Sequence, residues 1–322
     1  MFRATMPPVI RRRSFKYCGP VTTLPLTLGA LVTALWVLVL QAHHNSTVFT
    51  THLSVNPSIL SHPVTVNDVI VMVVTGAAHH QDRLVPILHT WAQWLPPDRL
   101  IIVSDVEDVQ LGTYMAPETG GGHGPSQKKW FHGVLEVLRV LRGGLKAKWI
   151  CVVDDDTFLF VPNLLRLLDS LDSFKSAIYG EICSLDACDG PCICGGGGWV
   201  APTQVFLELA EAFETYGAWP PPCCAEMYCS DQIISKWMNT VGNVTLVQTT
   251  EFKPFPPDLY TDSEKMRQHL PTHMVAEQIS WRNIVSFHYV GSGLHGTSND
   301  VSMELLYHLA SGFSGSFLKE RS

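Results

Sequence analysis

The stretch WICVVDDDTFLF, residues 149–160, decides the fold that we predict for this chain. An apolar run at 150–153 is followed at once by three adjacent carboxylates, Asp154, Asp155 and Asp156. A continuous apolar run of this kind is typical of a parallel strand that is buried on both faces. Because adjacent like charges repel one another, their grouping directly behind a buried strand indicates a shared function.

Strands and helices alternate around this stretch. Apolar runs predict two further buried strands at 69–76 and 100–105, and helical spacing of apolar residues predicts helices at 82–95, 126–144 and 162–171. This order predicts an α/β fold: a single Rossmann-like, mostly parallel sheet flanked by helices. Ligands of such sheets bind beyond the carboxyl ends of the strands, where the three acids lie.

The first forty residues differ in kind from the rest. Five basic residues and no acidic one precede an uncharged run at 21–40, and twenty apolar residues span about 30 Å, the thickness of the hydrocarbon core of a bilayer. The basic flank predicts a cytosolic tail at 1–20, an uncleaved transmembrane signal-anchor at 21–40 and a lumenal remainder, as in a single-pass type II protein. A cleaved signal peptide is the alternative, with a shorter apolar core. A polar, aperiodic stem is expected at 41–63 and a catalytic domain at 64–322.

Charge and cysteine content agree with a lumenal domain that does not bind nucleic acid. Removing the five basic residues of the tail from the total of 22 leaves 17 basic against 29 acidic side chains, and such a surface repels nucleic acid. Beyond the anchor the cysteines form an even set, for which disulfides are expected in an oxidising lumen. These are Cys151, Cys183, Cys188, Cys192, Cys194, Cys223, Cys224 and Cys229. N-glycosylation sequons stand at 45–47 and 243–245.

The acid triplet suits a hard divalent cation. Mg²⁺ and Mn²⁺ take oxygen ligands and bridge to the phosphates of a substrate, and on an extended backbone Asp154 and Asp156 would point to the same side. The alternative is a solvated turn that also caps the following helix. The buried strand ahead of the triplet favours the metal site.

Six segments resemble the fringe-type β1,3-glycosyltransferases, a group with fringe itself, the β1,3-glucosyltransferase of thrombospondin repeats and the core 1 β1,3-galactosyltransferase. They cover about residues 68–310 in the order of the family and read HHQDRLVPILHTWAQWL, LIIVSDVED, KWICVVDDDTFL, CGGGGWV, SDQIISKWM and VSFHYV. The resemblance implies the GT-A type of the predicted fold. It also implies an inverting, metal-dependent transferase that uses a UDP-sugar, with a catalytic domain in the Golgi or ER lumen.

Site residues follow from the resemblance, position by position. Asp231 matches the catalytic base. Asp154, Asp156 and His288 match the ligands of Mn²⁺ or Mg²⁺. The nucleotide-sugar is assigned to Thr75, Arg83, Asp105 and Asp155, and close approach of the backbone to the sugars is assigned to Gly195, Gly196, Gly197 and Gly198.

Each of these residues also has an ordinary structural reading. Arg83 can be an exposed arginine in a first helical turn, and Asp231 stands where a helix dipole favours an acid whatever the function. His288 lies in a strand-like pattern, in which a histidine with satisfied hydrogen bonds is the default. The glycines can form an ordinary loop.

We predict galactosyl transfer to O-linked GalNAc of a glycoprotein or glycopeptide, the core 1 type. Fringe-type transfer of GlcNAc or glucose to O-linked fucose is the alternative within the family. Two cysteine-rich segments, 181–194 and 220–229, depart from the family pattern and leave the acceptor open. From other classes, a metal-dependent lumenal hydrolase could use the same acids and histidine, and an adhesion module would need none of them.

Overall fold

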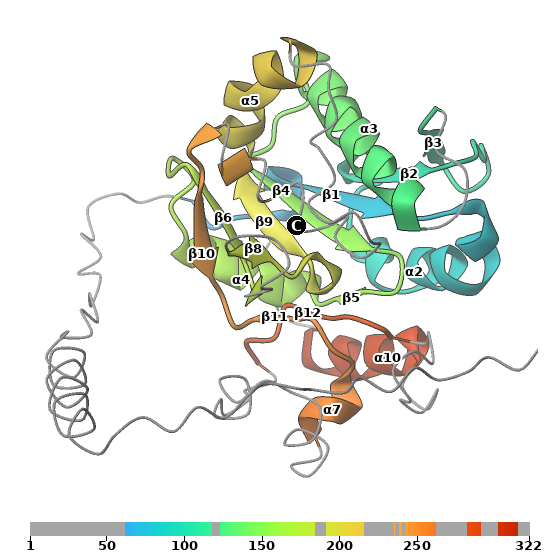
Figure 1. Cartoon of the computed structure of the whole chain (residues 1–322). Coiled ribbons are helices and arrows are strands. Elements are labelled where there is room, and N and C mark those ends of the chain that lie inside the picture. Colours follow the sequence, from blue (N-terminus) through green and yellow to red (C-terminus); the bar gives the residue numbers. More distant parts are fainter. Residues whose placement is uncertain are drawn as a thin grey trace, which may run out of the picture. The chain divides into compact units, whose positions relative to one another are not determined.

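The main sheet of the computed structural model has seven strands among the described residues, in the order β10-β6-β9-β4-β1-β2-β3 (Figure 1). Their bounds are β1 Val69–Val74, β2 Leu100–Ser104, β3 Thr113–Met115, β4 Trp149–Asp154, β6 Ala177–Gly180, β9 Trp199–Pro202 and β10 Thr245–Gln248. Only β9 runs antiparallel to its neighbours, β4 and β6. The predicted mostly parallel α/β sheet is therefore confirmed, and the three predicted strands are β1, β2 and β4.

The described residues are 62–117, 123–183, 191–215, 235, 238–239, 242–261, 282–290 and 302–314. All of them lie in the unit His62–Ser322. The predicted tail, the predicted anchor at 21–40 and Asp231 fall outside them and stay predictions. Within the described ranges no helix has the length and apolar character that a membrane crossing requires.

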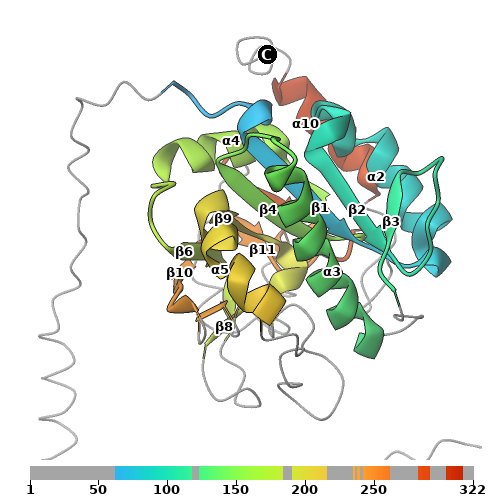
Figure 2. The same cartoon turned by 90° about the horizontal axis from the view of Figure 1, so that it is seen from above.

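Helices cover both faces of the sheet (Figures 1 and 2). One face carries α3 (His123–Arg142) and α5 (Thr203–Thr215), and the other carries α2 (Val85–His89), α4 (Val161–Ser170) and α10 (Met303–Ser314). Side chains of a strand alternate between the faces, so Val71 of β1 joins one buried cluster and Met72 the other. Burial on both faces is the reason that these strands read as continuous apolar runs.

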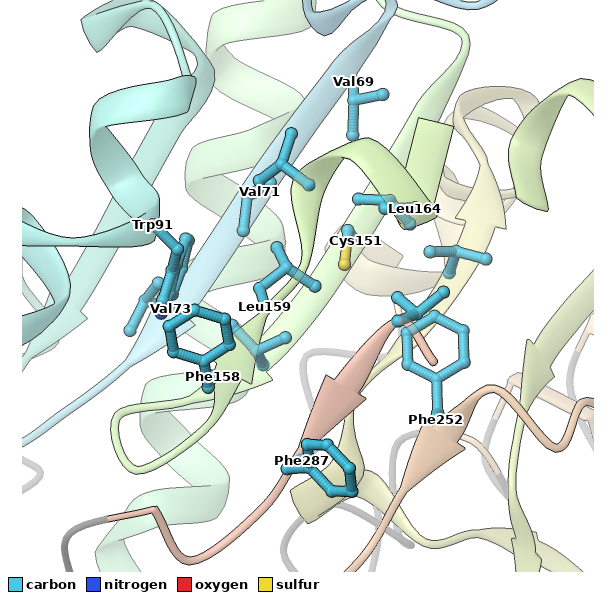
Figure 3. Close-up of a cluster of buried hydrophobic side chains, with 14 of the residues drawn as sticks. Val69, Val71, Val73, Trp91, Cys151, Phe158, Leu159, Leu164, Phe252 and Phe287 are labelled. Atoms are coloured by element: carbon cyan, nitrogen blue, oxygen red, sulfur yellow. The ribbon is translucent and has the colours of Figure 1, made fainter. Parts of the chain in front are cut away.

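Three short strands form a second sheet, which begins just after the carboxyl end of β4. They are β5 (Phe158–Leu159), β11 (Phe252–Lys253) and β12 (Ser286–Phe287), in the order β11-β12-β5. Figure 3 shows Phe158, Phe252 and Phe287 beside the core side chains of β1 and β4. A third pair, β7 (Ile182–Cys183) with β8 (Cys192–Ile193), and the short helix α7 (Pro257–Thr261) complete the described strands and α-helices.

The helix predicted at 82–95 is interrupted. A π-turn η3 (His80–Leu84), α2 and a 3₁₀ turn η4 (Trp91–Trp94) follow one another. The break is at Thr90, whose hydroxyl donates to the carbonyl of Pro86 at 2.6 Å. Trp91 then turns into the core and its indole nitrogen donates to the carbonyl of Thr157 at 3.1 Å, so burial of one large ring overrides the helical pattern.

Cys151 corrects the expectation that all eight cysteines after residue 40 form disulfides. It lies in the centre of β4, is wholly buried and carries a free thiol. Burial raises the pKa of this thiol, because the thiolate cannot be solvated there. Cys151 is therefore a small core residue, whereas Cys194 is disulfide-bonded.

A glycine sets the distance between α3 and the sheet. A Cβ atom at Gly133 would lie 2.5 Å from the sulfur of Met72 and 3.1 Å from Cγ2 of Val103. We expect Gly133→Ala to lower the free energy of unfolding by about 1 kcal/mol, because overpacking exceeds the gain in helix propensity. Denaturant unfolding of the full chain measures this change.

A second variant, Met72→Ala, serves as the control because it removes the sulfur atom that the new methyl group at residue 133 would contact. In a Met72→Ala background, Gly133→Ala should cost less than it does in the wild-type chain, since the sulfur is gone. If Gly133→Ala by itself has the same free energy of unfolding as the wild-type chain, the close packing of α3 on the sheet at this position is contradicted.

Candidate functional site

The acid triplet stands where β4 ends. Asp154 is the last residue of the strand, and the amide of Thr157 donates to its carbonyl at 3.2 Å, so Asp155 and Asp156 occupy a turn. The extended backbone predicted for all three residues is therefore wrong. The side chain of Asp154 is 30% exposed, whereas those of Asp155 and Asp156 are 8% and 5% exposed. Two of the three charges are thus buried and need partners.

Arg83 supplies the first partner. It lies in the π-turn η3, and its Nη1 is 2.9 Å from Oδ1 of Asp155 and 3.2 Å from Oδ2 of Asp156. One cation thus bridges both buried carboxylates. The charges of Asp156 and Asp155 raise the pKa of Arg83 in spite of its burial. An exposed arginine, the ordinary reading of this position, does not fit a side chain that is 21% exposed.

Thr75 and Asp105 stand at the carboxyl ends of β1 and β2. The hydroxyl of Thr75 donates to Oδ2 of Asp155 at 2.7 Å. Oδ1 of Asp105 accepts a hydrogen bond from the backbone amide of Ala77 at 2.8 Å, and this bond stabilises the turn after β1. The structure therefore brings Thr75 to the acid triplet and gives Asp105 a partner in the neighbouring turn.

Lys129 is a buried residue of this edge that the sequence analysis missed. Its ammonium donates to the carbonyl of Thr75 at 2.7 Å and lies 4.0 Å from Oδ1 of Asp105. Burial lowers its pKa, and the charges of Asp105, Asp155 and Asp154 only partly offset that effect. Its spacing in the sequence could have indicated this burial, because Lys129 lies four residues before Gly133 and therefore on the same, buried face of α3.

His288 reaches the triplet from a distant part of the chain. Antiparallel pairing of β12 with β5 sets Phe287 opposite Phe158, so the next residue, His288, falls beside the end of the triplet. Its Nε2 lies 3.0 Å from Oδ1 of Asp156 and 3.9 Å from Oδ2 of Asp154. The side chain is 11% exposed. The predicted meeting of a late histidine with the acids is thus present in the structure.

The pKa values of the two buried acids move apart. Burial and the charge of Asp156 raise the pKa of Asp155. Burial also acts on Asp156, but the contacts with His288 and Arg83 outweigh it, so the pKa of Asp156 lies below its usual value. Asp156 is therefore the better anion of the pair.

Asp154, Asp156 and His288 carry donor atoms of the types that a divalent cation takes. Adjacent ligands of an octahedral site with bonds of about 2.1 Å are about 3.0 Å apart, which is the separation of His288 from Asp156. Asp154 is farther from the histidine, and no group of three His, Cys, Asp or Glu side chains in the described ranges could hold a metal ion as it stands. Four carboxylates, Asp105 and Asp154–Asp156, lie in this cluster with Arg83 and Lys129, so the acidic side chains outnumber these two basic ones.

The glycine run is buried. Gly195–Gly197 form a 3₁₀ turn, η7, and Gly198 follows with a φ of +90°, which favours glycine. The backbone of these glycines closely approaches other groups of the protein. These are the ring of His288, the backbone of Lys253 and the carbonyl of Val152. Approach to a sugar stays a prediction, as does catalysis by Asp231, which lies outside the described residues.

Fold and site together define an α/β protein whose carboxyl edge presents two buried acids, a shared arginine and a histidine. Residues 64–188 match the Fringe family, described as Fringe-like. The matched segment contains Thr75, Arg83, Asp105 and the acid triplet, and it ends before the glycine run and His288. The resemblance to the fringe-like β1,3-glycosyltransferases is thus confirmed for this segment.

Two human proteins are similar to the chain. The β-1,3-N-acetylglucosaminyltransferase lunatic fringe of Homo sapiens is 29% identical over 130 residues, which are 39% of this chain and 33% of that protein. The β-1,3-glucosyltransferase of Homo sapiens is 33% identical over 152 residues, 46% of this chain and 29% of that protein. The chain thus spans about a third of the length of the curated relatives that it matches.

Among solved structures, a glycosyltransferase involved in the glycosylation of the major capsid of PBCV-1 is similar at a TM-score of 0.37 and 8% identity. The match covers 72% of this chain and 97% of that one. The glycosyltransferase GlyE of Streptococcus pneumoniae TIGR4 also has a TM-score of 0.37, with 10% identity over 78% of this chain and 62% of that one. At these scores neither likeness bears on the site.

Removing Arg83 should destabilise the fold. Arg83→Met leaves two buried carboxylates without their shared cation, and we expect a loss of about 3 kcal/mol in unfolding free energy at neutral pH. The matched control is Arg139→Met, which breaks an ion pair with Glu136 by removing a side chain that is 63% exposed. That change should cost less than about 1 kcal/mol. Equal losses in urea unfolding would contradict the bridging role of Arg83.

The stabilising effect of Asp105 should depend on pH. Hydrogen bonds and the nearby Lys129 hold the pKa of this carboxyl below its ordinary value although burial opposes them. A lowered folded-state pKa stabilises the fold above the unfolded pKa of about 4, and the stabilisation is lost as pH falls through the folded value. Asp105→Asn should therefore cost about 1 kcal/mol at pH 7 and less at pH 3.

Urea unfolding of the wild-type chain and of Asp105→Asn at a series of pH values tests this expectation. A difference between the two that stays constant from pH 7 to pH 3 would show that the charge of Asp105 does not matter for stability.

Proposed function

We propose that this chain is a fringe-type β1,3-glycosyltransferase that transfers a hexose from a UDP-sugar to a glycan on a glycoprotein. The observation that carries the proposal is the convergence of Arg83, Asp156 and His288 at the carboxyl edge of the sheet. The Fringe-like match of residues 64–188 supports it. Binding at this edge is what a parallel α/β sheet favours.

The donor sugar and the acceptor are finer proposals. Galactosyl transfer to O-linked GalNAc is the prediction from the sequence. The similar proteins carry names of a β-1,3-N-acetylglucosaminyltransferase and a β-1,3-glucosyltransferase, which supports transfer of GlcNAc or glucose as the second candidate. O-linked fucose as the acceptor of this second candidate is a prediction from the sequence. We also propose a type II anchor at 21–40 and a Golgi or ER lumenal site of action.

Asp154, Asp156 and His288 would hold Mn²⁺ or Mg²⁺. When bound, such an ion stabilises negative charge that develops on the departing UDP. Arg83 contributes from the protein side: it holds Asp155 and Asp156 in place and brings positive charge to the edge at which a diphosphate would bind. The hydroxyl of Thr75 fixes the orientation of Asp155.

The acceptor half of the reaction is assigned to Asp231. It would take the proton of the acceptor hydroxyl as that oxygen attacks C1 of the sugar. The new C1–O bond forms while the bond from C1 to the UDP oxygen breaks, and UDP leaves with the electron pair. A single displacement of this kind inverts an α-linked donor to a β product without a covalent enzyme intermediate.

A donor panel tests the proposal. The full chain in detergent is given Mn²⁺ and UDP-Gal, UDP-Glc or UDP-GlcNAc, each with a GalNAc-bearing or a fucose-bearing glycopeptide. We expect one donor and acceptor pair to give a β1,3-linked product. Asp231→Asn should lower kcat by about 10²- to 10⁴-fold, because the base is lost while donor binding is kept.

Two controls make the panel decisive. Asp156→Ala should abolish transfer by removing a metal ligand, whereas Asp98→Asn, at a side chain that is 60% exposed, should leave it unchanged. Reactions without acceptor measure hydrolysis of the donor. Equal turnover with and without acceptor would support a metal-dependent hydrolase instead, and failure of all three donors would overturn the proposal.

A further inference from the structure

The ring of His288 occupies the space in which residue 196 would carry a side chain. A Cβ atom at Gly196 would lie 2.0 Å from Cε1, 2.2 Å from Nδ1 and 2.7 Å from Nε2 of His288. No pair of unbonded heavy atoms approaches so closely. Any residue other than glycine at this position must therefore displace either the ring or the turn.

The turn cannot move easily. The hydroxyl of Thr157 donates to the carbonyl of Gly196 at 2.7 Å, and the hydroxyl of Ser286 donates to the carbonyl of Gly197. A Cβ at Gly197 would meet the backbone of Lys253 at 3.0 Å, which shows how tightly this segment is packed. Both hydroxyls are wholly buried, so shifting the turn would leave buried polar groups without partners.

The backbone of His288 is also held. Its amide donates to the carbonyl of Lys253 at 3.0 Å, and the amide of Val290 donates to the carbonyl of Asp156 at 2.9 Å. Between them, Tyr289 has a φ of +58°, a left-handed conformation that is uncommon for a tyrosine. The imidazole contacts Asp156 and stacks on the ring of Tyr289, with the ring centroids 3.6 Å apart. Rotation of the imidazole about its side-chain bonds is the smallest movement that makes room for a side chain at residue 196, and it takes the ring away from Asp156.

We propose that Gly196 is a positioning residue that seats the imidazole of His288 against Asp156. The contacts form a closed loop: Thr157, next to Asp156, binds Gly196, Gly196 makes room for the ring, and the ring contacts Asp156. The glycine run thus serves the histidine, a role that goes beyond approach to sugars. The consequence for metal binding rests on the proposed function, whereas the seat itself does not.

A double-mutant cycle in stability tests the seat. Gly196→Ala should lower the Tm of the full chain, because the new methyl group displaces the ring. In a His288→Ala background the same change should lower the Tm little or not at all, since the ring is absent. An equal loss of Tm in both backgrounds would overturn the proposal.

Binding of Mn²⁺ alone, followed by electron paramagnetic resonance of the free ion, gives a second readout. Gly196→Ala should weaken Mn²⁺ binding by about 10- to 100-fold, as loss of a supporting contact at a metal site typically does. The matched control is Gly242→Ala, where a Cβ would meet Cδ2 of Leu209 at 2.4 Å and Cγ2 of Val244 at 3.1 Å, so the new methyl group meets the core and not the glycine run. It should lower the Tm and leave Mn²⁺ binding unchanged.

The two arms separate the two proposals. Wild-type Mn²⁺ affinity in Gly196→Ala, or an equal loss of affinity in Gly242→Ala, would overturn the positioning role. If the wild-type chain binds no Mn²⁺, the proposed metal-dependent function fails, and the Tm cycle alone then decides whether Gly196 seats His288.

Discussion

Two buried carboxylates at the end of β4 are the constraint on which the site depends. Asp155 and Asp156 are almost wholly removed from water, and a buried charge without a partner would cost several kcal/mol. Arg83, from the turn that follows β1, bridges both. Thr75 and His288 are further partners of these acids, so residues from four separate parts of the chain contact one another at this point.

The second sheet brings His288, which is distant in the sequence, to the acids at the end of β4. Its register sets Phe287 opposite Phe158, and the aromatic side chains of β5, β11 and β12 join the core beneath β1 and β4 (Figure 3). Burial of these rings anchors the strand end from which His288 projects. Burial of apolar rings thereby determines where the backbone of His288 lies. The glycine turn then limits the orientations that the His288 ring can adopt.

The division of the chain into a matched and an unmatched part has a physical counterpart. The Fringe-like segment holds Arg83, Thr75 and the acid triplet, which contact one another directly. The glycine run and His288 lie beyond it and are held through β5 and β12.

The sequence by itself determined the alternation of strands and helices, the parallel core strands and the acids at a strand end. These depend on local periodicity, because side chains of a buried strand or an amphipathic helix repeat at fixed spacing. It did not indicate the break at Thr90, the free thiol of Cys151 or the burial of Lys129, since each follows from packing against residues far along the chain. The resemblance of the segment VSFHYV to the family pointed to His288, but its position against Gly196 was decided only by the tertiary structure. That contact joins residues 92 positions apart in the sequence, and no local pattern encodes which space a distant ring will fill.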